Sequence, residues 1–150
     1  MSLAQLRREL AYYSRRILDQ HLATGAGGNF SAREGSRILT FPSRFSLEDV
    51  TPEQYIEVDI QTGRFASRVL LPSSEVLMHL ACCRRRRDAK GVVHTHPPFT
   101  VALTSSGHKL EPIFADFVIY LGQDVSQVDY ITVTTPQLAA AVEVEIGKAN

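Results

Sequence analysis

The sequence has few cysteines, no excess of charge of either sign and no long apolar run. Its only cysteines, Cys82 and Cys83, are adjacent, which fits neither a CxxC zinc knuckle nor a disulfide framework, so we interpret both as packing residues in a reducing compartment. The chain has 16 basic and 16 acidic residues, and this balance disfavours nucleic acid as a partner. No segment approaches the roughly 20 apolar residues of a membrane span, and the N-terminus lacks the apolar core of a signal peptide. We therefore expect a cytoplasmic protein with a small-molecule partner.

The 150 residues suit a single domain in which helices and strands alternate. Apolar residues at intervals of three and four predict a first helix, and turn residues between β-prone segments predict two hairpins. Helices are predicted over 3–22, 71–87, 97–107, 115–122 and 135–149, and strands over 30–33, 37–41, 55–60, 64–70, 91–96 and 128–133. Ser73 or Ser74 is expected to cap the second helix and Thr135 the last. This order predicts an α/β (α+β-like) fold with a mostly antiparallel sheet.

The segment VVHTHPP, residues 92–98, contains a candidate metal-binding pair. Side chains two residues apart on a strand point to the same face, so His94 and His96 can converge on one ion. A catalytic zinc site uses three protein ligands, however, and two histidines are not enough. The alternative is a strand end at which both imidazoles merely form hydrogen bonds to the backbone.

Glu75 follows Ser73 and Ser74 at the start of a predicted helix, where the helix dipole alone favours an acidic residue. The same helix start also offers backbone N–H groups and hydroxyls to an anion, beside a carboxylate that could move protons. His79 lies one helical turn further on the same face. It is either a partner of Glu75 or a core histidine, and we favour the core.

Two other segments allow simpler interpretations. The glycine loop GAGGN, residues 25–29, lets a ligand approach the main chain, but it matches no nucleotide-binding fingerprint and could simply end a helix. The run RRRR, residues 84–87, is typical of a solvated helix end and contains no interleaved aromatic residues. We do not expect this run to bind nucleic acid.

Taken in order, the segments GGNFSAR, LTFPSR, LPSSEVLMH and GVVHTHPP resemble the successive motifs of the class II aldolase/adducin family. The resemblance implies a three-layer fold with a central, largely antiparallel sheet, usually assembled as a homotetramer. It implies that His94 and His96 bind Zn²⁺ or another divalent metal and that Glu75 is the catalytic acid/base. It also implies that the substrate phosphate is surrounded by Gly28, Asn29, Ser43, Ser73 and Ser74.

The family resemblance further implies a metal-dependent lyase of the aldolase type, acting on a small phosphorylated keto-sugar through an enediolate. Dehydration or epimerisation could use the same intermediate. A non-catalytic interaction module, like the adducin head, is the alternative. An amidohydrolase with an HxH strand end is disfavoured because its barrel needs about 250 residues.

The sequence departs from the family pattern in two places. Arg44 replaces the glycine that usually follows the serine of the phosphate loop, and it either binds a phosphate or carboxylate itself or points into solvent. The family's third metal histidine lies on a strand after the helix that corresponds to residues 135–149. We therefore expect that residues 1–150 form one domain truncated at its C-terminus, or else that the metal site is incomplete.

Overall fold

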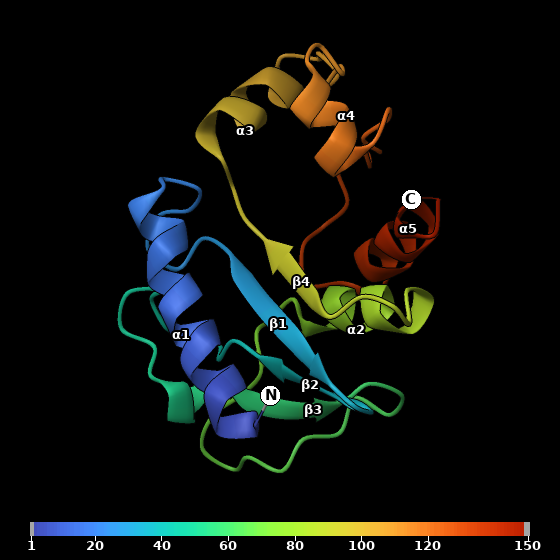
Figure 1. Ribbon diagram of the computed structural model, residues 1–150. Coiled ribbons are helices and arrows are strands. Elements are labelled where there is room, and N and C mark those ends of the chain that lie inside the picture. The colour runs from blue at the N-terminus through green and yellow to red at the C-terminus, as the bar shows by residue number, and fades with distance from the viewer. Residues whose placement is uncertain (1, 149–150) are drawn as a thin grey trace.

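The structure, a computed structural model, describes residues 2–148 and contains a four-stranded antiparallel sheet in the order β3-β2-β1-β4 (Figure 1). The strands are β1 (Asn29–Glu34), β2 (Arg37–Thr40), β3 (Ile56–Asp59) and β4 (Gly91–His94). The predicted hairpin of β1 and β2 is confirmed, with Ser31 opposite Thr40. β4 returns from a distant part of the chain to pair with the other edge of β1. All three pairings are antiparallel.

Helices cover both faces of this sheet. α1 (Leu3–Asp19) lies against one face and α2 (Val76–Arg85) against the other, with α5 (Pro136–Ile146) packed on α2 (Figure 1). The chain also forms the short helices η1 (Pro52–Gln54), α3 (Pro98–Ser105) and α4 (Ala115–Leu121). The expected three-layer fold around a largely antiparallel sheet is thus confirmed. None of the helices within residues 2–148 is both long and apolar enough to cross a membrane.

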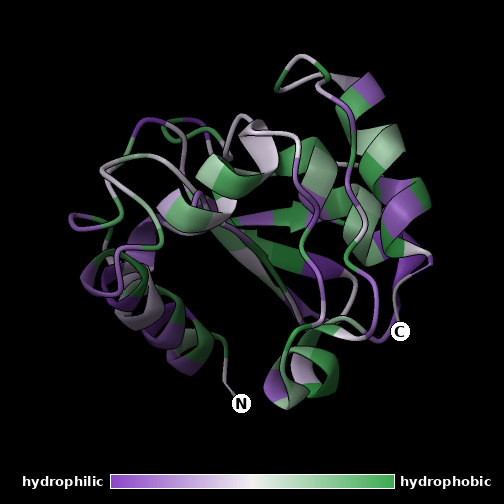
Figure 2. Ribbon diagram, turned by 90° about the horizontal axis from the view of Figure 1, so that it is seen from above, coloured by the Kyte–Doolittle hydropathy of each residue, from purple (hydrophilic) through white to green (hydrophobic). Residues whose placement is uncertain are grey.

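Alternation along the strands divides the core into two clusters, one on each sheet face. Leu39 packs with Leu10 of α1, whereas its neighbour Ile38 packs with Leu80 of α2. Successive strand residues point to opposite faces, so one short strand contributes to both clusters. In Figure 2 the strands at the centre carry both hydrophobic and hydrophilic stretches, and hydrophilic residues recur along the helix that follows the N-terminus. Cys83 is a buried, free thiol in the second cluster, as expected for a packing residue.

Of the two predicted N-terminal helix caps, one is confirmed and the other is wrong. Thr135 caps α5 as predicted, because its side chain accepts a hydrogen bond from the Leu138 N–H at 3.3 Å. The predicted serine cap of α2 is wrong, since the N-cap residue is Glu75 and the helix begins at Val76. The Ser73 hydroxyl instead accepts the N–H of Glu75 at 3.2 Å, which stabilises the turn before the helix. The helix therefore starts one or two residues later than a serine cap would place it.

Two predicted strands are wrong. Residues 64–70 form only an isolated bridge between Phe65 and Val58. The turn before this segment is held by the Asp59 carboxylate, which accepts the N–H groups of Gln61 and Thr62. Residues 128–133 pair with no strand in the described part of the chain, and Tyr130 is 88% exposed. Residues 64–70 thus lie beside the edge strand β3 without forming a continuous ladder, and residues 128–133 have no strand partner within residues 2–148.

Candidate functional site

The pairing of β1 with β4 brings two predicted site residues together. Asn29 lies directly opposite His94 in the register, with 3.4 Å between Asn29 Nδ2 and His94 Nδ1. Gly28 permits this approach: its φ is +123°, and a Cβ atom there would lie 2.8 Å from the carbonyl oxygen of His94. The end of the glycine loop therefore lets the backbone of β4 come close, which no residue with a side chain could do without displacement.

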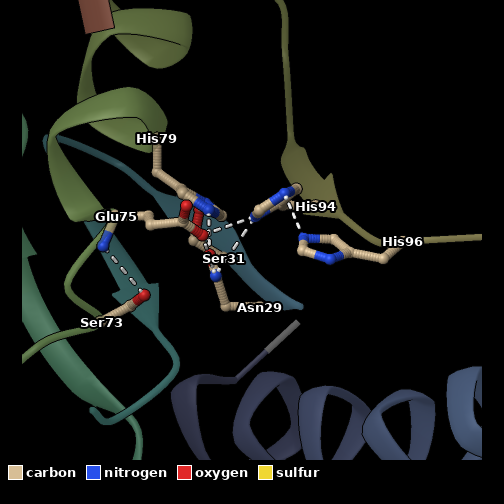
Figure 3. A network of polar contacts seen from close by, with 7 residues as sticks. All are labelled: Asn29, Ser31, Ser73, Glu75, His79, His94 and His96. Carbon is tan, nitrogen blue, oxygen red and sulfur yellow. Dashed lines mark hydrogen bonds and ion pairs between the residues drawn. The ribbon is translucent and has the colours of Figure 1, made fainter. Parts of the chain in front are cut away.

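Glu75 lies at the centre of the polar cluster in Figure 3. Its Oε2 accepts hydrogen bonds from Asn29 Nδ2 at 2.7 Å and from His94 Nδ1 at 2.6 Å. The hydrogen bond from His94, followed by that from Asn29, outweighs burial and lowers the pKa of Glu75 to about 2. The carboxylate is therefore ionised at neutral pH.

His79 lies behind Asn29, and its side chain is fully buried. Its Nε2 is 2.5 Å from Asn29 Oδ1, and its Nδ1 is 2.8 Å from the hydroxyl of Ser31. Burial, more than any nearby charge, lowers the pKa of His79 to about 4. The interpretation as a core histidine is right about burial but misses its link to Asn29. The spacing of four residues between His79 and Glu75 was the sequence signal that could have indicated a role for His79 in the site.

The two histidines of the HxH motif converge, although not as members of one strand. β4 ends at His94, and the backbone N–H of His96 donates to the carbonyl of Leu22 at 3.0 Å. The Nε2 atoms of His94 and His96 are nevertheless 3.0 Å apart. Both rings therefore present the same nitrogen to a shared point, as Figure 3 shows.

This donor pair fits a divalent ion in part. Two imidazole nitrogens bound at about 2.0–2.1 Å to one tetrahedral ion are about 3.3–3.4 Å apart, so the observed separation of 3.0 Å between the Nε2 atoms would have to widen slightly. The bond from His94 Nδ1 to Glu75 also resembles the carboxylate contact that commonly orients a metal-binding imidazole. Within residues 2–148, however, no group of three histidine, cysteine or acidic side chains is arranged to hold an ion.

A pocket of about 140 Å³ adjoins this cluster. It forms because the loops on either side are paired: the Ser43 N–H donates to the carbonyl of Leu71, and the Ser73 N–H to that of Phe41, both at 2.8 Å. A larger hollow of about 630 Å³ over β3 contains none of the predicted site residues. The smaller pocket is lined by the predicted residues Gly28, Asn29, Ser43, Arg44, Ser73, Ser74, Glu75 and His96.

Arg44, the departure in the phosphate loop, has a left-handed backbone with φ of 68°. Glycine adopts this conformation without the steric cost that a Cβ atom introduces. The left-handed backbone at Arg44 is thus one that favours glycine. The Arg44 side chain is exposed at the edge of the pocket, where it could meet an anion.

Comparisons with known proteins agree with this architecture. The chain is 32% identical over 143 residues to the 5-deoxy-D-ribulose 1-phosphate aldolase of Bacillus thuringiensis, covering 94% of this chain and 66% of that protein. It is 27% identical over 125 residues to an L-fuculose phosphate aldolase of Methanocaldococcus jannaschii, covering 83% of this chain and 67% of that protein. The crystal structure of YgbL from Escherichia coli superposes with a TM-score of 0.89 at 25% identity, covering 98% of this chain and 72% of that chain.

The match to a family extends over almost the whole sequence. Residues 8–150 correspond to the Class II Aldolase and Adducin N-terminal domain. This range includes the glycine loop, Glu75 and both histidines of the HxH motif. The chain therefore belongs to the class II aldolase and adducin N-terminal domain family.

Proposed function

We propose that the protein is a metal-dependent lyase of the aldolase type that cleaves a small phosphorylated keto-sugar. The observation that carries this proposal is the convergence of Glu75, His94 and His96 beside one small polar pocket. The relatives named above are aldolases of ribulose 1-phosphate and fuculose phosphate compounds. The chain spans between 56% and 66% of the length of the curated ribulose-phosphate aldolases it matches, so the activity of the whole protein is inferred.

Substrate binding is assigned to the loops around the pocket. Ser43, Ser73 and Ser74 line it, and α2 begins directly after Glu75. Hydroxyls and a helix N-terminus both favour an anion, and a guanidinium can bind phosphate through two parallel hydrogen bonds. We assign the substrate phosphate to this group of residues together with Gly28, Asn29 and Arg44.

His94 and His96 would hold Zn²⁺ or another divalent ion, which, when bound, would polarise the carbonyl of the keto-sugar. For a ketose 1-phosphate, cleavage breaks the bond between C3 and C4. The C4 hydroxyl loses its proton as the aldehyde forms, the bonding electrons pass into the enediolate over C2 and C3, and C3 then gains a proton. Every atom is thereby accounted for in dihydroxyacetone phosphate and an aldehyde.

Glu75 is the residue placed to carry that proton. Its carboxylate is ionised in the resting structure and can accept a proton. While both Asn29 and His94 donate to it, the carboxylate is a weak base. Proton transfer therefore requires that substrate binding release at least one of these two donors, which moves the pKa of Glu75 toward the reaction pH.

The direct test is turnover of L-fuculose 1-phosphate and 5-deoxyribulose 1-phosphate by the natural protein loaded with zinc. Release of dihydroxyacetone phosphate is followed by its enzymatic reduction with NADH. Cleavage of either sugar supports the proposal. No cleavage of either, by folded and metal-loaded protein, contradicts it.

Two observations favour a second candidate, an interaction module like the adducin head. No third ligand completes a metal cluster among residues 2–148, and a strained Arg44 stands in the phosphate loop. A scaffold would require neither a complete metal site nor a strain-free phosphate loop. It would retain the fold yet bind neither zinc nor a sugar phosphate.

We also propose that the protein is a homo-oligomer, in keeping with the tetramer that the resemblance implies. Large apolar side chains of α3, α4 and the segment after them are exposed, including Phe99 at 90%, Ile119 at 70% and Tyr120 at 82%. Such clustered apolar exposure is typical of a subunit contact. α3 and α4 stand apart from the sheet in Figure 1, which leaves them accessible to another subunit.

A further inference from the structure

A continuous chain of hydrogen bonds runs from the protein interior to Glu75. The Ser31 hydroxyl is 2.8 Å from His79 Nδ1, His79 Nε2 is 2.5 Å from Asn29 Oδ1, and Asn29 Nδ2 is 2.7 Å from Glu75 Oε2. The exposed fractions are 2% for Ser31, 0% for His79 and 6% for Asn29, so water scarcely reaches the inner links. Figure 3 shows these side chains gathered around the carboxylate, with dashed lines for the hydrogen bonds.

The direction of each hydrogen bond follows from the carboxylate. Ionised Glu75 can only accept, so the amino group of Asn29 must donate to it, and the carbonyl Oδ1 of Asn29 must then face His79. His79 Nε2 must therefore carry a proton and donate. A neutral imidazole accepts at its other nitrogen, so the Ser31 hydroxyl donates to Nδ1.

We propose that His79 is a positioning residue for Glu75, acting through Asn29. The neutral Nε2–H tautomer of His79 binds the carbonyl of Asn29 and thereby fixes the amide with its amino group toward the carboxylate. A flipped amide would place its oxygen 2.7 Å from a carboxylate oxygen, where two acceptors repel. The Ser31 hydroxyl satisfies Nδ1 of this tautomer, and His79 fixes the Asn29 amide, so a group with no contact to substrate helps to determine how Glu75 is held.

A hydrophobic core does not require the linked polar side chains of Asn29, Ser31 and His79. Asn29 and Ser31 are two apart on β1, so both point to the face that α2 covers, and His79 meets both from one helix position. An apolar side chain at 79 could fill the same space without needing two buried partners. Three polar residues in this interior are instead linked end to end, and the last of them donates to Glu75.

The tautomer is tested without metal or substrate. In the ¹⁵N-labelled, metal-free chain, a long-range ¹H–¹⁵N spectrum at pH 7 is expected to show His79 protonated at Nε2 only. The Asn29→Ala variant is expected to shift the Nε2 resonance, because that nitrogen loses its acceptor. A proton on Nδ1, an imidazolium at pH 7, or no shift in Asn29→Ala would overturn the proposal.

The consequence for turnover rests on the proposed function. His79→Leu is expected to lower kcat by about 10- to 100-fold with little change in KM, the range seen when outer partners of a site are removed. His79→Gln should recover most of kcat, because its amino group can take the place of Nε2–H. Cys83→Ala, a buried change on the same helix with no polar link to the site, is the matched control and should retain kcat.

These measurements separate the two proposals. Equal kcat values for His79→Leu and Cys83→Ala, or no recovery in His79→Gln, would reduce His79 to a structural role. If the wild type cleaves no sugar phosphate, the proposed function fails and the tautomer measurement alone decides the position of Asn29. The same spectrum decides the matter if His79→Leu does not fold.

Discussion

Glu75 Oε2 and His94 Nδ1 are joined by a hydrogen bond of 2.6 Å, although Glu75 precedes α2 and His94 ends β4. Through this bond the proposed proton carrier and a proposed metal ligand share one contact. A change at Glu75 is therefore expected to affect both the proton and the orientation of the imidazole.

Glu75→Gln is expected to depress turnover by roughly 10²–10⁴, because glutamine keeps the size and an acceptor oxygen but cannot take and return a proton. The fold and bound ion should survive. Turnover with a melting curve measures both, and Glu48→Gln, an exposed acid outside the site, is the control. Unchanged turnover would remove Glu75 from the mechanism, whereas a large loss of melting temperature alone would make it a structural helix-start residue.

Zinc is expected to bind to residues 1–150 more weakly than to a three-ligand site, because water must fill the remaining positions. Metal analysis after dialysis should show little retained zinc, and His96→Ala should lower affinity further. His108→Ala, which removes an exposed histidine away from the pocket, should have no effect. Stoichiometric zinc that resists chelators would show that another side chain completes the site.

Stability is expected to fall as the pH drops from about 6.5 toward 4. The folded-state pKa of His79 is about 4, below its ordinary 6.5, so the unfolded chain binds a proton first and acid favours unfolding. The slope is on the order of 1.4 kcal/mol per pH unit across this window. Urea denaturation at pH 7, 6 and 5 measures it, and His79→Gln should flatten the slope while His108→Gln leaves it intact.

Arg44→Gly should relieve the left-handed strain at φ 68° and raise the free energy of unfolding by up to about 1 kcal/mol. The same change removes a guanidinium from the pocket edge and should weaken binding of inorganic phosphate. Thermal melting and phosphate titration test the two effects separately. Phosphate affinity equal to that of wild type would place the Arg44 side chain in solvent.

Self-association is expected at micromolar concentration, because burial of the exposed apolar side chains of α3 and α4 against another subunit is favourable. Light scattering should report a mass above 16.7 kDa. Replacing Ile119 and Tyr120 by lysine should shift the protein toward monomer, whereas Glu48→Lys should not. A wild type that remains monomeric would contradict the oligomer.

Local sequence pattern was sufficient wherever one element decides the outcome. The amphipathic period of α1, the β1–β2 hairpin and the Thr135 cap all depend on residues close together in the chain. The family motifs also indicated Glu75 and the histidine pair before their positions were known. Their roles remain predictions.

Pairing between distant segments could not be predicted from local sequence pattern. Residues 64–70 and 128–133 have strand-like composition, but whether a segment pairs depends on an available sheet edge, which composition does not encode. The start of α2 was likewise decided by contacts of its preceding loop with Phe41. Propensity is a weak prior, and tertiary contacts override it.

The hydrogen-bonded side chains behind Glu75 likewise depend partly on local sequence pattern and partly on tertiary packing. The local pattern places His79 one helical turn beyond Glu75 and Asn29 at the end of a glycine loop. The contact between His79 and Asn29, which are 50 positions apart and share a hydrogen bond of 2.5 Å, does not follow from that pattern. A buried imidazole must find partners for both nitrogens, and which partners it finds depends on how α2 packs against β1.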